Sequence, residues 1–147
     1  MFKNLTNKTA MKLIKLFLRI SISIGFLSAV ADRFGLWGKE YAVWGNWDAF
    51  LEYTAVINPW FPETIIPVVG FLATTAEIVF AIFLLIGFKT ELVAKLSGIL
   101  LFIFGVSMAF SLGIKSPLDY SVFIASAAAF SLSLLKDKFL EVDSLKN

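Results

Sequence analysis

Four long runs of apolar residues constrain this chain more than any other feature of its sequence. They cover residues 13–31, 65–88, 92–112 and 118–135. A helix needs about 20 residues to cross a hydrocarbon core of ~30 Å, and each run is close to that length. The runs are continuously apolar and too few for a transmembrane β-barrel, in which apolar and polar residues alternate. The sequence therefore predicts four transmembrane helices.

The basic residues predict how these helices are oriented. Of the 13 Lys and Arg residues, ten lie at one end of the predicted helices: Lys3, Lys8, Lys12, Lys15, Arg19, Lys89, Lys95, Lys136, Lys138 and Lys146. The other end has three: Arg33, Lys39 and Lys115. Because Lys and Arg concentrate on the cytoplasmic side, both termini are predicted to be cytoplasmic, and the 32–64 loop faces outward. Short connections favour antiparallel neighbours, so the predicted fold class is all-α, a single-domain integral membrane four-helix bundle with up-down-up-down topology over residues 1–147.

The outer 32–64 loop is rich in aromatic residues and contains all four tryptophans of the chain. Trp and Tyr favour the membrane interface, which predicts that this loop lies on the outer leaflet as an interfacial helix; the alternative is a lid over a substrate. Asn46 is a predicted helix N-cap, and Asn58-Pro59 would end that helix. Ser116 is the predicted N-cap of the fourth long helix, with Pro117 at its first position.

The absence of cysteine and histidine limits the chemistry of the chain. It excludes disulfides, thiol redox reactions, and the usual protein ligands of haem and iron–sulfur clusters. No carboxylate cluster suggests a metal site, and a net charge of +2 is too small to indicate a nucleic-acid partner. Any electron transfer would therefore need a bound organic cofactor or a partner subunit.

The end of the first apolar run also fits a signal-peptide cleavage site, because Ala29-Val30-Ala31 has small residues at the two required positions. We expect the segment to be retained. The run from residue 13 is long enough to span a bilayer, and its removal would leave only three helices.

Glu77 lies near the centre of the second run, roughly 16–18 Å from either end at 1.5 Å per residue. A charged carboxylate is costly in lipid, so Glu77 is predicted to face the other helices. At helical spacing it shares a face of small and polar residues with Gly70, Thr74, Ala81 and Leu84, which is typical of a helix interface in membranes. Glu77 and Thr74 are therefore a candidate intramembrane proton or ligand site; the alternative is an interhelical hydrogen bond without a functional role.

Arg19 and Lys95 are predicted at the inner face, with side chains extended to the inner lipid headgroups. A pair between Arg19 and Glu77 is the alternative for Arg19. Helical side chains lean toward the N-terminus of their own helix, which sends these two apart. The charged C-terminal residues 135–147 are predicted to be a solvated tail.

A second polar cluster is predicted at the outer end of the bundle. Asp32 and Arg33 follow the first run, and Asp119 and Tyr120 begin the fourth, so all four can meet above Glu77. One interpretation is an ion pair of Arg33 with Asp32 or Asp119 that locks the first helix to the fourth. The other is a ligand site whose cavity has Glu77 at its base.

Several strings together resemble the DoxX family of small four-helix bacterial membrane proteins. They are "SAVADRFGLWG", "FLEYTAVINPW", "ATTAEIVFAIFLLIGFKTEL" and "GIKSPLDYSVFIASAAAF", and the resemblance covers about residues 12 to 135. It implies a multi-pass protein of the bacterial cytoplasmic membrane. Some members are described as subunits of thiosulfate:quinone oxidoreductase, or of membrane oxidoreductase complexes that respond to oxidative stress.

These features lead to two main functional hypotheses. The first is a non-autonomous subunit of a membrane oxidoreductase that binds quinone or anchors a membrane or soluble redox partner. The second is a non-catalytic scaffold or lipid-binding protein whose polar residues are structural. A small transporter is a third, weaker hypothesis; it would need a homo-oligomer, because the sequence shows no internal repeat. None of them involves a covalent cofactor or a metal.

Overall fold

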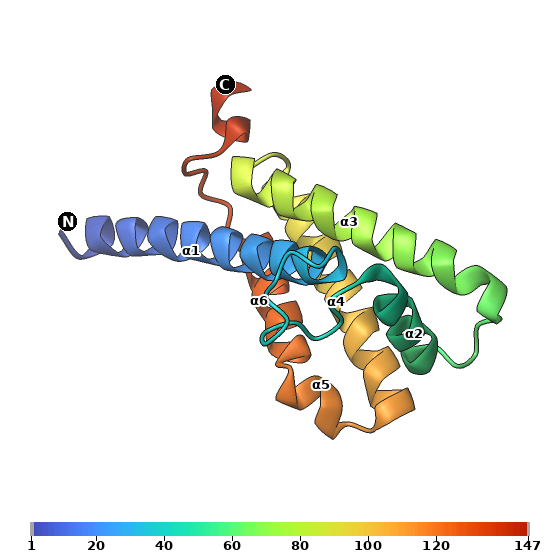
Figure 1. The fold of residues 1–147 in the computed structure, drawn as a ribbon. Coiled ribbons are helices and arrows are strands. Elements are labelled where there is room, and N and C mark those ends of the chain that lie inside the picture. The colour runs from blue at the N-terminus through green and yellow to red at the C-terminus, as the bar shows by residue number, and fades with distance from the viewer. Residues whose placement is uncertain (1, 147) are drawn as a thin grey trace.

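The computed structural model describes the backbone of residues 2–146 and the side chains of residues 7–145. Within this part of the chain all regular secondary structure is helical (Figure 1), which confirms the all-α class. The helices are α1 (Phe2–Arg33), α2 (Trp47–Ile57), α3 (Ile66–Ile86), α4 (Thr90–Leu112), α5 (Lys115–Asp119) and α6 (Val122–Leu134), with the short 3-10 helices η1 (Glu63–Ile65) and η2 (Val142–Lys146). Lys3 and Lys146 of the predicted inner face lie outside the described side chains.

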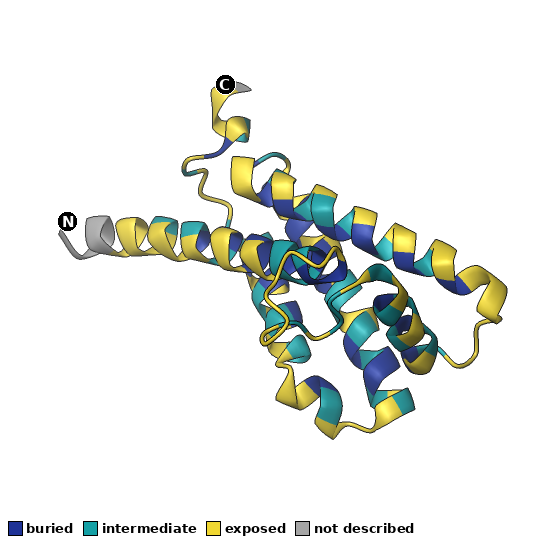
Figure 2. Cartoon of the chain, in the orientation of Figure 1, coloured by how far each residue is buried: buried dark blue, intermediate teal, exposed yellow. Residues whose placement is uncertain are grey.

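Three helical segments are long and apolar enough to cross a membrane: Asn7–Arg33, Glu63–Ile86 and Thr90–Leu112. They correspond to the first three predicted runs. The first continues to Arg33, beyond its predicted end at residue 31. Figure 2 shows that much of the helical surface is exposed, and large apolar side chains such as Phe17 and Phe71 are among the exposed residues. Such a surface suits lipid rather than water.

The structure divides the fourth predicted helix, 118–135, into two. α6 has 13 residues, or about 20 Å of helix, which is shorter than a hydrocarbon core of ~30 Å. The break falls at Tyr120 and Ser121, where Ser121 has a φ of 56° in the left-handed region that interrupts a right-handed helix. The predicted N-cap is also wrong, because Ser116 lies inside α5.

The predicted helix in the outer loop is confirmed as α2. The Asn46 side chain caps it by accepting a hydrogen bond from the N–H of Ala49 at 2.9 Å. At the other end Asn58 is the C-cap, and the Pro59 ring prevents continuation. The N-cap preference and the proline together fixed this element locally.

The long helices associate in two pairs (Figure 1): α1 lies beside α3, and α4 lies beside α6. A core of small and apolar side chains joins the pairs: Ile22, Phe26, Ala81, Leu84, Val93, Ala94, Ala129 and Leu132. In the α4–α6 pair, a Cβ at Gly98 would lie only 2.9 Å from the Phe130 ring. Glycine at this position therefore makes room for the aromatic ring.

Candidate functional site

One large cavity of about 1270 Å³ lies between α1, α2, α3, α4 and α6. Most of its wall is apolar, with Ile22 and Phe26 from α1, Leu72 from α3 and Phe104 from α4. Binding sites for small molecules are usually concave and apolar, with a few placed polar groups. The predicted ligand-site residues Glu77, Asp32, Arg33 and Tyr120 all line this cavity.

Glu77 forms an ion pair with Arg33 in the wall of this cavity. The predicted small and polar face of α3 is buried, from Gly70 through Thr74 and Glu77 to Leu84. Arg33 donates to Glu77 Oε1 at 3.0 Å through Nη2, and Nη1 contacts both Glu77 Oε2 and Thr74 Oγ1, the latter at 2.7 Å. The Arg33 side chain is 4% exposed and that of Glu77 is 3% exposed. The pair is therefore shielded from solvent and has no net charge.

Aromatic rings cover the remaining face of the Arg33 guanidinium. Its Cζ lies 4.1 Å from the centroid of the Phe50 ring and 5.4 Å from that of Trp44. Arg33 Nε is buried and has no hydrogen-bond partner within the described residues. Cation–π attraction to the rings partly compensates for the missing hydrogen bond.

Asp32 organises the outer loop. It does not form the ion pair with Arg33 that one interpretation of the outer cluster predicted. Its carboxylate accepts hydrogen bonds from three consecutive backbone N–H groups, those of Val43 at 2.9 Å, Trp44 at 3.0 Å and Gly45 at 3.1 Å. These bonds hold the loop over the end of α1 and bring the Trp44 ring to Arg33.

Asp119 lies outside the predicted outer cluster. It pairs with Lys115 on the exposed surface of α5, so an ion pair of Asp119 with Arg33 is also wrong. Tyr120 lines the cavity, at the break between α5 and α6. The four predicted residues therefore separate into an ion-pair residue, a loop organiser, a surface residue and a cavity residue.

Sequence reasoning missed three uncharged polar groups in the cavity wall. Ser107 Oγ donates to Asn58 Oδ1 at 3.3 Å, which links α4 to the end of α2. Tyr53 of α2 lines the cavity, and burial raises the pKa of its phenol above the ordinary value, with neighbouring Tyr120 adding to the increase. Only the aromatic-rich loop sequence pointed to this region.

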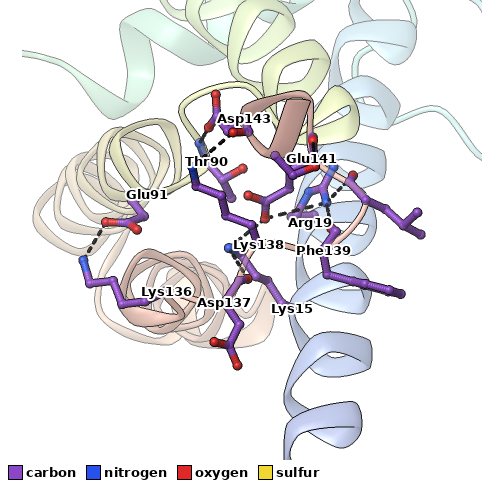
Figure 3. Close-up of polar contacts among 12 residues, drawn as sticks. Lys15, Arg19, Thr90, Glu91, Lys136, Asp137, Lys138, Phe139, Glu141 and Asp143 are labelled. Atoms are coloured by element: carbon purple, nitrogen blue, oxygen red, sulfur yellow. Dashed lines mark hydrogen bonds and ion pairs between the residues drawn. The ribbon is translucent and has the colours of Figure 1, made fainter. Parts of the chain in front are cut away.

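A second polar cluster lies at the opposite end of the α1–α3 pair, where Figure 3 shows Lys15, Arg19 and Glu141 together. Arg19 donates to the carbonyl oxygens of Leu84 and Leu85 at the end of α3, both at 2.8 Å. It also donates to those of Phe139 and Leu140 at 2.9 Å. The side chain is 1% exposed, so the predicted extension of Arg19 to the lipid headgroups is not what the structure shows. Lys95, by contrast, is exposed.

The predicted solvated tail is instead partly docked, through residues 137–143, which we call the C-terminal strap. Glu141 of the strap is buried and forms an ion pair with Lys15 at 2.7 Å, and lies 3.8 Å from Arg19. Lys15 also donates to the Asp137 carbonyl at 2.9 Å. The Asp143 carboxylate accepts from the N–H of Thr90, 3.4 Å away at the positive end of the α4 dipole. Two buried cations therefore meet a carboxylate and several carbonyl groups.

Comparison of the chain with models of known protein families, with curated proteins and with solved structures finds no match. The function must therefore be inferred from the cavity and its polar groups.

Proposed function

We propose that this chain is a multi-pass protein of the bacterial cell membrane, with an up-down-up-down arrangement and cytoplasmic termini. Three helices of membrane length support this proposal. The contacts of Arg33 with Glu77 and of Arg19 with Leu84 require α1 and α3 to be antiparallel. In this proposal α5 and α6 together make the fourth crossing. The ten basic residues of one end would then face the cytoplasm.

We propose further that the chain is DoxX-like and binds quinone in its cavity, as a non-autonomous subunit of a membrane oxidoreductase assembly. The observation that carries this proposal is the apolar cavity of about 1270 Å³ with a buried ion pair in its wall. The volume exceeds that of typical small-molecule pockets, roughly 300–1000 Å³, and so accommodates a ring with an attached apolar chain.

The proposed role is that of a subunit rather than a complete enzyme. The sequence contains no cysteine or histidine, so the chain itself offers no thiol and no imidazole for redox chemistry. Electrons would pass between the quinone and a redox partner that the chain anchors. The substrate of that partner is set by the partner and not by this cavity.

One observation favours the alternative of a structural or lipid-binding protein. Arg33 and Glu77 neutralise each other's charge, and Phe50 and Trp44 cover the guanidinium. In this alternative the ion pair holds α1 against α3 and has no other role. In that case the cavity would contain bulk membrane lipid without selection. The two proposals therefore differ in what the purified protein carries.

The test is to purify the protein in a mild detergent and to identify the bound molecules by lipid extraction and mass spectrometry. Ala128 lines the cavity and the neighbouring Ala127 is exposed, so Ala128→Phe and Ala127→Phe form a matched pair that leaves Glu77 untouched. We expect stoichiometric quinone in the wild type and in Ala127→Phe, and its loss in Ala128→Phe.

Two outcomes would decide against quinone binding. If only bulk phospholipid is extracted, the scaffold or lipid-binding alternative is correct. If a redox protein is retained with no quinone, the chain anchors a partner and the cavity has no part in electron transfer. Equal quinone content in the two alanine variants would place the quinone outside the cavity.

A further inference from the structure

Each charged residue that lines the cavity already forms an ion pair or hydrogen bonds within the protein. Arg33 and Glu77 neutralise each other. The third, Asp32, is 5% exposed and accepts three backbone hydrogen bonds from the outer loop. A charged ligand would lose its hydration on entering this apolar space and find no free counter-ion. The wall therefore selects against carboxylates, phosphates and ammonium groups.

All three tyrosines of the chain line the cavity, and two of them, Tyr53 and Tyr120, lie near enough for the second to act electrostatically on the first. Tyr53 reaches the cavity from α2, and Tyr120 reaches it from the break between α5 and α6. Within the described residues neither hydroxyl forms a hydrogen bond. An O–H group beside an apolar cavity is a natural donor to an acceptor oxygen.

Tyr120 is close enough to act electrostatically on Tyr53, although the two residues come from elements far apart in sequence. Burial raises the pKa of the Tyr53 phenol, and Tyr120 adds to that increase. Tyr53 therefore stays protonated at neutral pH and keeps its donor hydrogen. The left-handed Ser121 that divides α5 from α6 follows directly after Tyr120, so the break sets the position of this side chain.

We propose that the cavity selects an uncharged amphiphile whose acceptor oxygen is held by the phenol groups of Tyr53 and Tyr120. The proposal rests on the proposed function only in that a ligand occupies this cavity. The cavity also borders Leu18, fifteen residues before Arg33 on α1, or roughly 22 Å along the helix. The apolar chain of the ligand would lie along α1 toward Leu18, with its carbonyl or ether oxygen at the tyrosines.

The test compares three probes with the same chain length: decyl-benzoquinone, monodecanoylglycerol and decanoate. Their binding to the detergent-solubilised protein is titrated by native mass spectrometry. We expect the two uncharged probes to bind and decanoate to bind at least tenfold more weakly. Tyr53→Phe and Tyr120→Phe should each weaken the uncharged probes about two- to tenfold, the usual worth of one hydrogen bond. Ser133→Ala, which removes a half-buried hydroxyl of α6 outside the cavity, should change nothing.

The outcomes separate this inference from the proposed function. If monodecanoylglycerol binds with tyrosine dependence and the quinone does not, quinone binding is wrong and the selection of uncharged acceptors stands. If the quinone binds equally well to both phenylalanine variants, the tyrosine anchor is wrong and quinone binding stands. If decanoate binds as tightly as the uncharged probes, or if none of the three binds, the inference is overturned.

Discussion

The two ends of the α1–α3 interface, which we call outer and inner after the predicted orientation, each hold a buried arginine of α1, but in different ways. At the outer end Arg33 is bound by side chains of α3, the carboxylate of Glu77 and the hydroxyl of Thr74. At the inner end Arg19 is bound by four backbone carbonyl groups, those of Leu84, Leu85, Phe139 and Leu140. Glu141 is only a more distant partner of this guanidinium, at 3.8 Å.

The two arginines therefore depend on different parts of the chain. The charge of Arg33 is balanced by one side chain, so the stability of the outer end depends on the identity of residue 77. Arg19 instead depends on the path of the backbone at the end of α3 and in the C-terminal strap. Substitution of a carboxylate should therefore damage the outer end most, and displacement of the strap should damage the inner end most.

Glu77→Gln should produce the largest loss of stability. The variant keeps the shape of the side chain and an acceptor oxygen, but it leaves the Arg33 charge buried without a counter-ion. Removing one partner of a buried ion pair costs about 3 kcal/mol or more. The free energy of unfolding, measured by denaturant titration in mixed detergent micelles, should fall by that amount.

The double variant Arg33→Gln with Glu77→Gln is the control for this prediction. It removes both charges, so it should recover most of the stability that Glu77→Gln loses. If the double variant is as unstable as the single one, the loss comes from shape and hydrogen bonding, and the charge balance of Arg33 is not what holds the outer end together.

Gly87→Ala should have the next largest effect, and it acts on the inner end. Gly87 has a φ of 70°, and a Cβ there would lie 2.6 Å from both Cα and Cγ of Glu141. The left-handed conformation and the displaced strap together should cost about 2 kcal/mol. Hydrogen–deuterium exchange should show faster exchange at the Asp143 N–H, which donates to the Gly87 carbonyl at 3.2 Å.

Gly113→Ala provides the matched comparison. Gly113 also has a positive φ, 86°, but a Cβ there would meet nothing within 4 Å. Its substitution should lower stability through backbone strain and leave the exchange of the strap unchanged. If both variants expose the strap equally, strap docking does not depend on the contact between Gly87 and Glu141.

The sequence predicted the outer end of the interface better than the inner end. A lone carboxylate in an apolar run stands out, and the helical period around Glu77 identified the face of α3 that is buried. The partner of Glu77 was not predicted, because Arg33 was expected to pair with Asp32 or Asp119. Three loop N–H groups bind Asp32 instead, and backbone groups leave no pattern in a sequence.

The inner end and the fourth helix were predicted poorly for related reasons. The acceptors of Arg19 are mostly carbonyl groups, which every residue has, so nothing in the tail sequence marked it as a binding partner. The break between α5 and α6 falls at Tyr120 and Ser121. Neither is a Gly or Pro, the residues that usually signal a break in a helix. α2, in contrast, was predicted because Asn46 and Pro59 act on their immediate neighbours.

Glu141→Gln should have the smallest effect of the three substitutions and makes the comparison with Glu77→Gln quantitative. Both variants remove one buried negative charge and keep the side-chain shape. After Glu141→Gln, however, Arg19 keeps all four carbonyl acceptors, and Lys15 keeps that of Asp137. Lys15 also has a long side chain that can turn its ammonium group toward water. We therefore expect a loss of about 1.5 kcal/mol, at the low end of the range for one hydrogen bond to a charged group. The same denaturant titration measures this loss.

A loss equal to that of Glu77→Gln would contradict the comparison. It would mean that Glu141 balances the charges of the inner end as Glu77 does at the outer end, and that both ends are held together by charge balance.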